Sequence, residues 1–140
     1  MKIYRNFILI LSGCILMSFE KSSEVNPERA KIVFLHERAF WGYQVEIKIN
    51  NQQVILLPSN KYFTIEVEAG NIQIAVSRGS ISSPEIQTTL TAEPDKIYYL
   101  KIYREIDYFT NKLYLVRESE QTAKQAMKSM KSEKIPLKNE

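Results

Sequence analysis

The chain has 140 residues, of which 44% are hydrophobic and 25% charged, a composition typical of one globular domain that buries its own core. It has one cysteine and one histidine, which excludes disulfide-stapled scaffolds, zinc fingers and iron–sulfur clusters. The net charge is +3, whereas phosphate binding needs a concentrated basic surface. We therefore expect no nucleic-acid partner.

Residues 1–19 have the pattern of a signal segment. Lys2 and Arg5 precede an apolar stretch that extends to Phe19, which is shorter than the roughly 20 apolar residues that span a bilayer. The stretch contains Leu11-Ser12-Gly13-Cys14, which matches the bacterial lipobox, in which the cysteine thiol is joined to diacylglycerol and becomes the new N-terminus. The sequence predicts lipidation at Cys14 and, once Lys2 and Arg5 are removed, a mature net charge of +1.

An ordinary export signal or an uncleaved anchor is the alternative, because the apolar stretch before Cys14 is short and Ile15-Leu16-Met17 is unusually apolar for the start of a mature lipoprotein. Both interpretations export the domain, and an oxidising compartment agrees with the absence of a second cysteine. We expect a domain in the periplasm of the bacterial cell envelope that is anchored to a membrane by its N-terminal lipid. A secreted or single-pass anchored protein is the alternative. Residues 20–28 are polar and predict a flexible tether.

A β-rich domain is predicted over residues 29–131. Apolar residues such as Tyr43, Val45 and Ile47 alternate with polar ones, which is the pattern of antiparallel sheets with one buried face. Turn-forming residues interrupt these runs every 8 to 12 residues or so, as in sandwiches and barrels. The fold class is therefore mainly β, an antiparallel β-sandwich of about eight strands with one C-terminal amphipathic helix. The strands are expected near residues 30–37, 43–49, 52–57, 61–68, 71–78, 85–92, 96–104 and 112–117.

The same alternation predicts which side chains form the core. Each is an apolar residue on the buried face of its strand. The predicted core contains Val45, Ile47, Phe63, Ile65, Val67, Ile72, Ile74, Tyr98, Leu100 and Ile102.

The stretch 96–104 is apolar on both faces, which predicts a central strand covered on both sides. Ala123, Ala126, Met127 and Met130 recur at helical spacing after the last strand, so a helix is expected to pack on this sheet. A methionine stripe can instead serve as a pliable partner-binding face. Residues 132–140 are charged, contain a proline and predict a flexible tail.

Several of these segments resemble the bacterial lipoprotein family catalogued as domain of unknown function twenty-eight forty-six. The resemblance covers residues 30–127 and depends on the strand that leads from Tyr62 to Gly70 and on Ile97-Tyr98-Tyr99-Leu100. The chain departs from the family pattern at Ala69, where a proline is usual, and at Asp95-Lys96, which lacks the usual glycine. The resemblance implies a sandwich fold and brings no activity, catalytic residue or cofactor. A sandwich of the PEGA or carboxypeptidase-regulatory type would give many of the same signals.

No catalytic arrangement is evident in the sequence. His36 has no serine or cysteine motif beside it, and its strand position predicts a residue on the sheet surface. Glu66 and Glu68 share a strand face and are close enough to share a calcium ion or an acid-base task, but a solvated strand face explains them better. We expect no enzyme, no metal and no cofactor.

Aromatic and arginine side chains gather in predicted loops. If consecutive strands run up and down, the loops near residues 38–42, 58–60, 79–84 and 105–111 lie at one end and the tether enters at the other. Aromatic and arginine side chains are typical of protein-binding hot spots, although Phe40 and Trp41 could instead close the end of the core. The candidate binding surface contains Phe40, Trp41, Tyr108 and Phe109 with Arg38, Arg78 and Arg104 around them.

Two functions agree with these features. The first is a lipid-anchored, non-enzymatic envelope domain that binds another envelope protein or a cell-wall component. The alternative is a structural or accessory subunit of an envelope assembly, contacting that assembly through the C-terminal helix.

Overall fold

Nine strands and one short helix form the part of the chain that the computed structural model describes, residues 28–79, 84–109 and 111–135. The predicted lipobox with Cys14 and nearly all of the predicted tether lie outside these residues. The prediction of a mainly β chain is confirmed. The elements are β1 (Arg29–His36), β2 (Gln44–Ile49), β3 (Gln52–Pro58), β4 (Lys61–Glu68), β5 (Gly70–Ser77), β6 (Ile86–Ala92), β7 (Ile97–Ile106), β8 (Asn111–Glu118), α1 (Glu120–Met127) and β9 (Lys131–Ser132).

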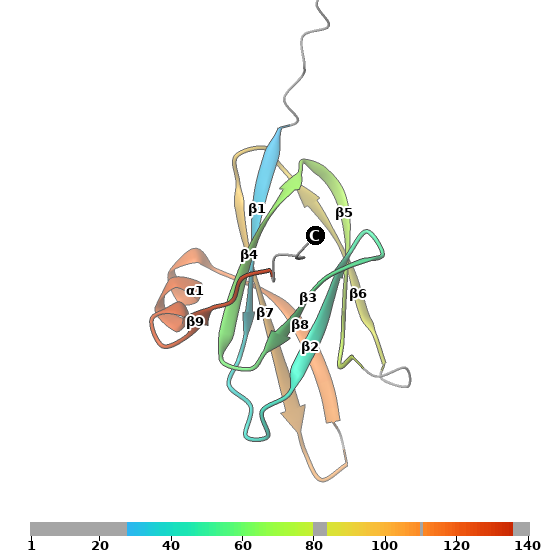
Figure 1. The fold of residues 1–140 in the computed structure, drawn as a ribbon, viewed down its shortest axis with the longest axis vertical. Coiled ribbons are helices and arrows are strands. Elements are labelled where there is room, and N and C mark those ends of the chain that lie inside the picture. The colour runs from blue at the N-terminus through green and yellow to red at the C-terminus, as the bar shows by residue number, and fades with distance from the viewer. Residues whose placement is uncertain (1–27, 80–83, 110, 136–140) are drawn as a thin grey trace, which may run out of the picture.

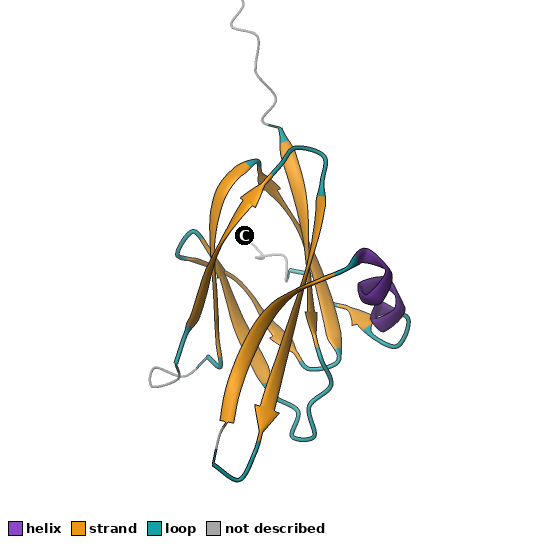
Figure 2. Ribbon diagram, turned by 180° about the vertical axis from the view of Figure 1, so that it is seen from behind, coloured by secondary structure: helices purple, strands orange, loops and turns teal. Residues whose placement is uncertain are grey.

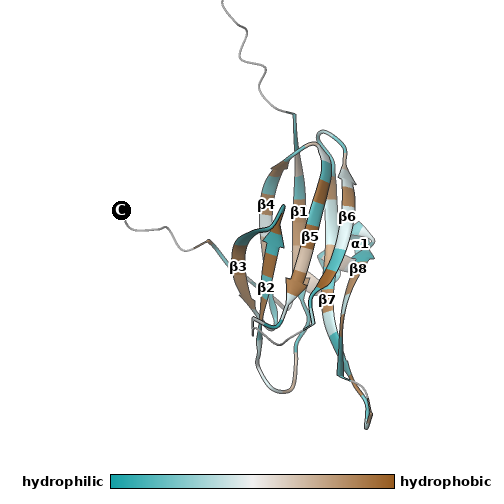
Figure 3. Cartoon of the chain, turned by 90° about the vertical axis from the view of Figure 1, so that its right-hand side faces the viewer, coloured by the Kyte–Doolittle hydropathy of each residue, from teal (hydrophilic) through white to brown (hydrophobic). Residues whose placement is uncertain are grey.

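The strands form two sheets that face each other as in a β-sandwich (Figure 1). The five-stranded sheet has the order β8-β7-β1-β4-β9, and the four-stranded sheet has the order β3-β2-β5-β6. Hydrophobic and hydrophilic residues alternate along the strands of the four-stranded sheet (Figure 3). This alternation lets each sheet bury one face against the other.

The prediction of a purely antiparallel fold is wrong at two pairings. Strands β1 and β7 pair in parallel, with Ile32 opposite Tyr98 and Phe34 opposite Leu100, and β4 pairs in parallel with the short β9. Successive strands from β1 to β8 alternate in direction, so β1 and β7 run the same way (Figure 1). They form a parallel pair because they run in the same direction and the fold places them side by side. The alternation of apolar and polar residues does not indicate which strands are neighbours.

The core lies between the two sheets. Eight of the ten predicted core residues are buried there, and Ile65 and Val67 are partly buried against the same cluster. The middle strand of the larger sheet is β1, which buries side chains on both of its faces. Ile32 and Phe34 point into the sandwich, while Val33 and Leu35 belong to a second cluster on the opposite face.

Helix α1 covers that opposite face of the five-stranded sheet, away from the other sheet (Figure 2). The Ser119 side chain caps its N-terminus by accepting a hydrogen bond from the Thr122 amide. Ala123 is buried, and the partly buried Ala126, Met127 and Met130 pack on the cluster that contains Val33, Leu35 and Tyr99. The helix ends at Met127, so Met130 reaches this cluster from the turn that follows.

Candidate binding surface at the loop end

Three connections meet at the end of the sandwich opposite the start of β1 (Figure 1). They are the β1–β2 loop, the β3–β4 turn and the β7–β8 hairpin, and we call this end of the domain the loop end. The Ser59 amide donates a hydrogen bond to the Tyr43 carbonyl over 3.1 Å, which ties the β3–β4 turn to the end of the β1–β2 loop. The fourth loop expected here includes residues 80–83, which lie outside the described residues.

The predicted aromatic residues of the loop end are exposed to solvent. Phe40 and Trp41 in the β1–β2 loop expose 90% and 72% of their surface, and Tyr108 and Phe109 in the β7–β8 hairpin expose 99% and 96%. The rings of Phe40 and Trp41 meet edge to face with centroids 5.1 Å apart. Ile106 adds a further exposed apolar side chain. Trp41 is therefore not a plug of the core, because most of its surface is in contact with water.

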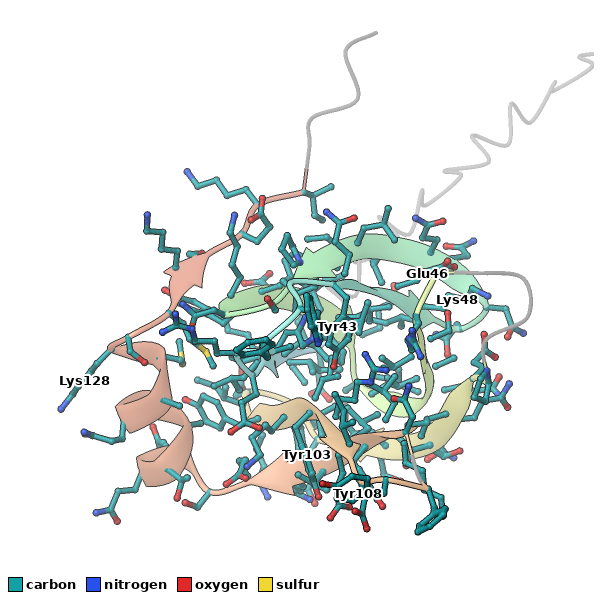
Figure 4. The ribbon with its side chains drawn as sticks, turned by 90° about the horizontal axis from the view of Figure 1, so that it is seen from below. Tyr43, Glu46, Lys48, Tyr103, Tyr108 and Lys128 are labelled. Carbon is teal, nitrogen blue, oxygen red and sulfur yellow. The ribbon has the colours of Figure 1, made fainter. Side chains whose placement is uncertain are left out.

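A cleft of about 120 Å³ lies between the β1–β2 loop and the end of β7. Figure 4 shows the domain from this end, with Tyr43 near the centre and Tyr103 and Tyr108 to one side. The cleft therefore lies beside the β1–β2 loop that carries Phe40 and Trp41, and Ile106 in its lining leads directly into the β7–β8 hairpin. Its lining consists of Glu37, Arg38, Ala39, Phe40, Trp41, Tyr43, Arg104 and Ile106.

One arginine side chain contacts the half-buried ring of Tyr43, and a second acts on it through its charge. The Arg104 guanidinium carbon lies 5.3 Å from the centre of this ring, a cation–π distance, and its Nε donates a hydrogen bond to Asn111 Oδ1. Burial raises the pKa of the Tyr43 phenol, and the positive charges of Arg104 and Arg78 offset part of that rise. Arg38 and Arg78 are both exposed. The loop end is thus aromatic and locally basic.

His36 is fully buried, so the prediction of a residue on the sheet surface is wrong. Its Nδ1 lies 2.9 Å from the Leu57 carbonyl oxygen on the facing sheet, and its ring meets that of Tyr43 edge to face at 4.9 Å. Burial lowers the pKa of His36, and the carbonyls of Leu57 and Pro58 oppose this effect in part. The ring therefore packs beneath Tyr43 as a neutral imidazole.

The strand pattern contained the signal for this burial. His36 follows Ile32 and Phe34 at a spacing of two and therefore shares their inward face. A polar side chain favours the sheet surface, and His36 is buried nevertheless. The Leu57 carbonyl satisfies its Nδ1, while its Nε2 has no hydrogen-bond partner among the described residues.

Glu66 and Glu68 are exposed strand residues far from the cleft. Glu66 forms ion pairs with Arg29 over 3.6 Å and with Lys31 over 3.9 Å. Within residues 28–79, 84–109 and 111–135, no three His, Cys, Asp or Glu side chains gather closely enough to hold a metal ion. The carboxylate of Glu66 thus belongs to an exposed ion-pair cluster in this structure.

Sequence reasoning missed the contributions of Tyr43 and Ile106 to the cleft. Tyr43 fits the strand alternation and was therefore assigned to a buried face, and Ile106 ends a long strand without any distinguishing motif. A stacked pair of tyrosines, Tyr103 and Tyr114, was also missed, with ring centroids 5.0 Å apart. The register of β7 against β8 brings this pair together, and that register is not visible in the sequence.

Comparisons with known proteins give this chain no relative. No family model, no curated protein and no solved structure matches it. The resemblance to the lipoprotein family stays a prediction. Among the described residues, no helix is long and apolar enough to cross a membrane.

Proposed function

We propose that this protein is a non-enzymatic binding module of the bacterial cell envelope that captures another envelope protein or a cell-wall component through its loop end. One observation carries the proposal. Four aromatic side chains from two separate loops are at least 72% exposed, and arginines accompany them at the same end of the domain. Scattered exposed apolar residues are ordinary in soluble proteins, but a cluster of them indicates an interaction surface.

The energetics of such a surface favour binding. An aromatic side chain buries roughly 150–250 Å² when it is fully covered, at about 25 cal/mol per Å². Covering half of three such side chains would contribute about 7 kcal/mol, before the cost of association is subtracted. Association costs about 4–15 kcal/mol, so burial of the aromatic rings offsets much of this cost and further contacts, such as those of the arginines, must add to it.

The proposed anchor agrees with this arrangement. The described chain begins at the end of the sandwich opposite the aromatic residues (Figure 1). If Cys14 is lipidated, the tether would run from the membrane to this opposite end, and the aromatic residues would face away from the bilayer. The lipobox motif Leu11-Ser12-Gly13-Cys14 supports the anchor.

The packing of α1 gives less support to the alternative function, an accessory subunit that contacts an envelope assembly through this helix. Its apolar stripe packs on the outer face of the five-stranded sheet, so an assembly could contact only the remaining, mostly charged and polar surface of α1. Deleting the helix would expose Val33, Leu35 and Tyr99 and would damage the fold as well as any interface. The two functions are better separated by probes placed at exposed positions.

Site-specific photo-crosslinking in the full-length protein tests the proposal in living cells. A photoreactive phenylalanine analogue replaces Phe109 in the loop end, Gln125 on the exposed side of the helix or Thr89 on the four-stranded sheet. All three positions are exposed. We expect a discrete crosslinked product from position 109 and none from position 89. A product from position 125 without one from position 109 would favour the accessory-subunit function and contradict our proposal.

A further inference from the structure

We infer that the cleft at the loop end recognises an acidic segment of a partner protein, in which a carboxylate lies next to an apolar side chain. This inference rests on the proposed function and narrows it from an envelope component to an acidic protein segment. The cleft lies between the β1–β2 loop and the end of β7, so a peptide bound there would contact Phe40 and Trp41 on one side and Ile106 on the other.

The apolar part of the site comes from two elements. Phe40, Trp41 and Tyr43 line the cleft from the β1–β2 loop, and Ile106 lines it from the end of β7. The cleft volume of about 120 Å³ suits a single side chain. Phe40, Trp41 and Ile106 keep most of their surface in water, so covering them with an apolar group of the partner is favourable.

The charges around the cleft favour an acidic ligand. Arg38 and Arg104 line it, and the charge of Arg78 acts on Tyr43. In the described part of the chain, none of these three arginines has a carboxylate oxygen within 4.0 Å. Guanidinium groups bind carboxylates through paired hydrogen bonds, which gives both energy and orientation.

Two of the three acidic residues nearby accept hydrogen bonds from within the chain. Glu105 accepts a hydrogen bond from the Tyr114 side chain, and this contact contributes to the raised pKa of Tyr114. Asp107 Oδ1 accepts a hydrogen bond of 2.7 Å from the Tyr108 amide. Glu37 is the one carboxylate in the lining of the cleft, and it also acts on Lys101. The arginines thus outnumber the carboxylates in the cleft itself.

A protein segment fits this site better than a lipid surface. Asp107 is exposed in the β7–β8 hairpin, directly between Ile106 and Tyr108, and inserting these residues into a bilayer would remove its carboxylate from water at a high cost. A flat bilayer would contact the projecting aromatic residues, whereas Arg38 and Arg104 line a cleft that a narrow peptide side chain can enter. An acidic peptide can satisfy both groups.

Trp41 provides the readout, because it is the one tryptophan of the chain. The full-length protein, in detergent micelles, is titrated with the peptide acetyl-Glu-Leu-Glu-amide, and acetyl-Gln-Leu-Gln-amide serves as the neutral control. We expect a saturable change in Trp41 fluorescence with the acidic peptide and at least fivefold weaker binding of the neutral one. Equal affinities, or no response to either peptide, would overturn the inference.

Arginine variants test the charge contribution directly. Arg38→Gln and the double variant Arg38→Gln/Arg104→Gln should each weaken binding of the acidic peptide at least threefold, whereas Lys128→Gln, which removes one exposed charge from the distant helix end, should not. If the double variant fails to fold, binding by Arg38→Gln alone tests the inference, because Arg38 is exposed and its replacement should leave the fold intact. Unchanged binding in Arg38→Gln would contradict the inference.

Two further outcomes separate this inference from the proposed function. A fluorescence response to phosphatidylglycerol vesicles, with none to the acidic peptide, would replace the protein segment by a lipid surface and overturn the inference. If the crosslink from position 109 persists at full strength in the double variant, the arginine cleft is not the recognition site, although the loop end still binds. If the chain with the photoreactive residue at position 109 and both arginines intact gives no crosslinked product, the proposed function itself is contradicted.

Discussion

Replacing His36 should remove a pH dependence of stability that this one side chain introduces. His36 is fully buried, and burial lowers its pKa below the usual value of 6.5. Below pH 6.5 the unfolded chain therefore binds a proton that the folded chain does not bind. The free energy of unfolding consequently falls as the pH falls, by at most about 1.4 kcal/mol for each pH unit. This limits the loss between pH 7 and pH 5 to about 2 kcal/mol.

His36→Asn is the variant that tests this reasoning. An asparagine amide can still donate to the Leu57 carbonyl that now lies 2.9 Å from Nδ1, but it does not titrate. Urea unfolding at pH 7 and at pH 5 gives the two free energies for each protein. The chain has one histidine, so other side chains contribute little to the change in unfolding free energy between pH 7 and pH 5. We expect a clear loss of stability at pH 5 in the wild type and a much smaller loss in the variant. Equal losses in both proteins would refute the conclusion that burial lowers the pKa of His36.

Three further changes test the fold and the anchor. Phe34→Ala should lower the free energy of unfolding by about 3–5 kcal/mol, because Phe34 is fully buried. Phe40→Ala should lower it by less than about 0.5 kcal/mol, because Phe40 is 90% exposed. Similar losses for the two variants in urea unfolding would contradict this difference in burial. Ser119→Ala should destabilise the chain by about 1 kcal/mol through loss of the helix cap, and Ser119→Asp should retain the stability. Cys14→Ala should prevent lipidation and removal of residues 1–13, which mass spectrometry of membrane fractions measures, and normal processing of this variant would favour an ordinary export signal.

The strand positions could be predicted because each strand carries its own signal. Val45 and Ile47 alternate with polar residues, and the bounds of β2 follow that alternation closely. Asn50 and Asn51 adopt positive φ angles of 50° and 65° in the β2–β3 turn, a conformation that asparagine tolerates and that such tight hairpins favour. These signals are local, so one sequence is sufficient to detect them.

Neighbour relations were less predictable because they depend on the whole fold. The parallel pairing of β1 with β7 joins strands about 65 residues apart, such as Ile32 with Tyr98. The burial of His36 depends on a carbonyl of the facing sheet. The same limit applies to the site. The exposed aromatic residues are predictable from their loops, but the cleft around Tyr43 arises where the β1–β2 loop meets the end of β7.

The exposed aromatic residues are central to this account, and partner capture by a Trp41→Ala variant tests them most directly. Trp41 is 72% exposed, so its loss should change the midpoint of urea unfolding little. The measurement is the amount of the partner crosslinked from position 109, per folded molecule, with and without the substitution. We expect the crosslinked amount to fall steeply, as a loss of about 2 kcal/mol or more in binding free energy implies, which is in the hot-spot range. Unchanged capture, or a large loss of stability with normal capture per folded molecule, would contradict this account.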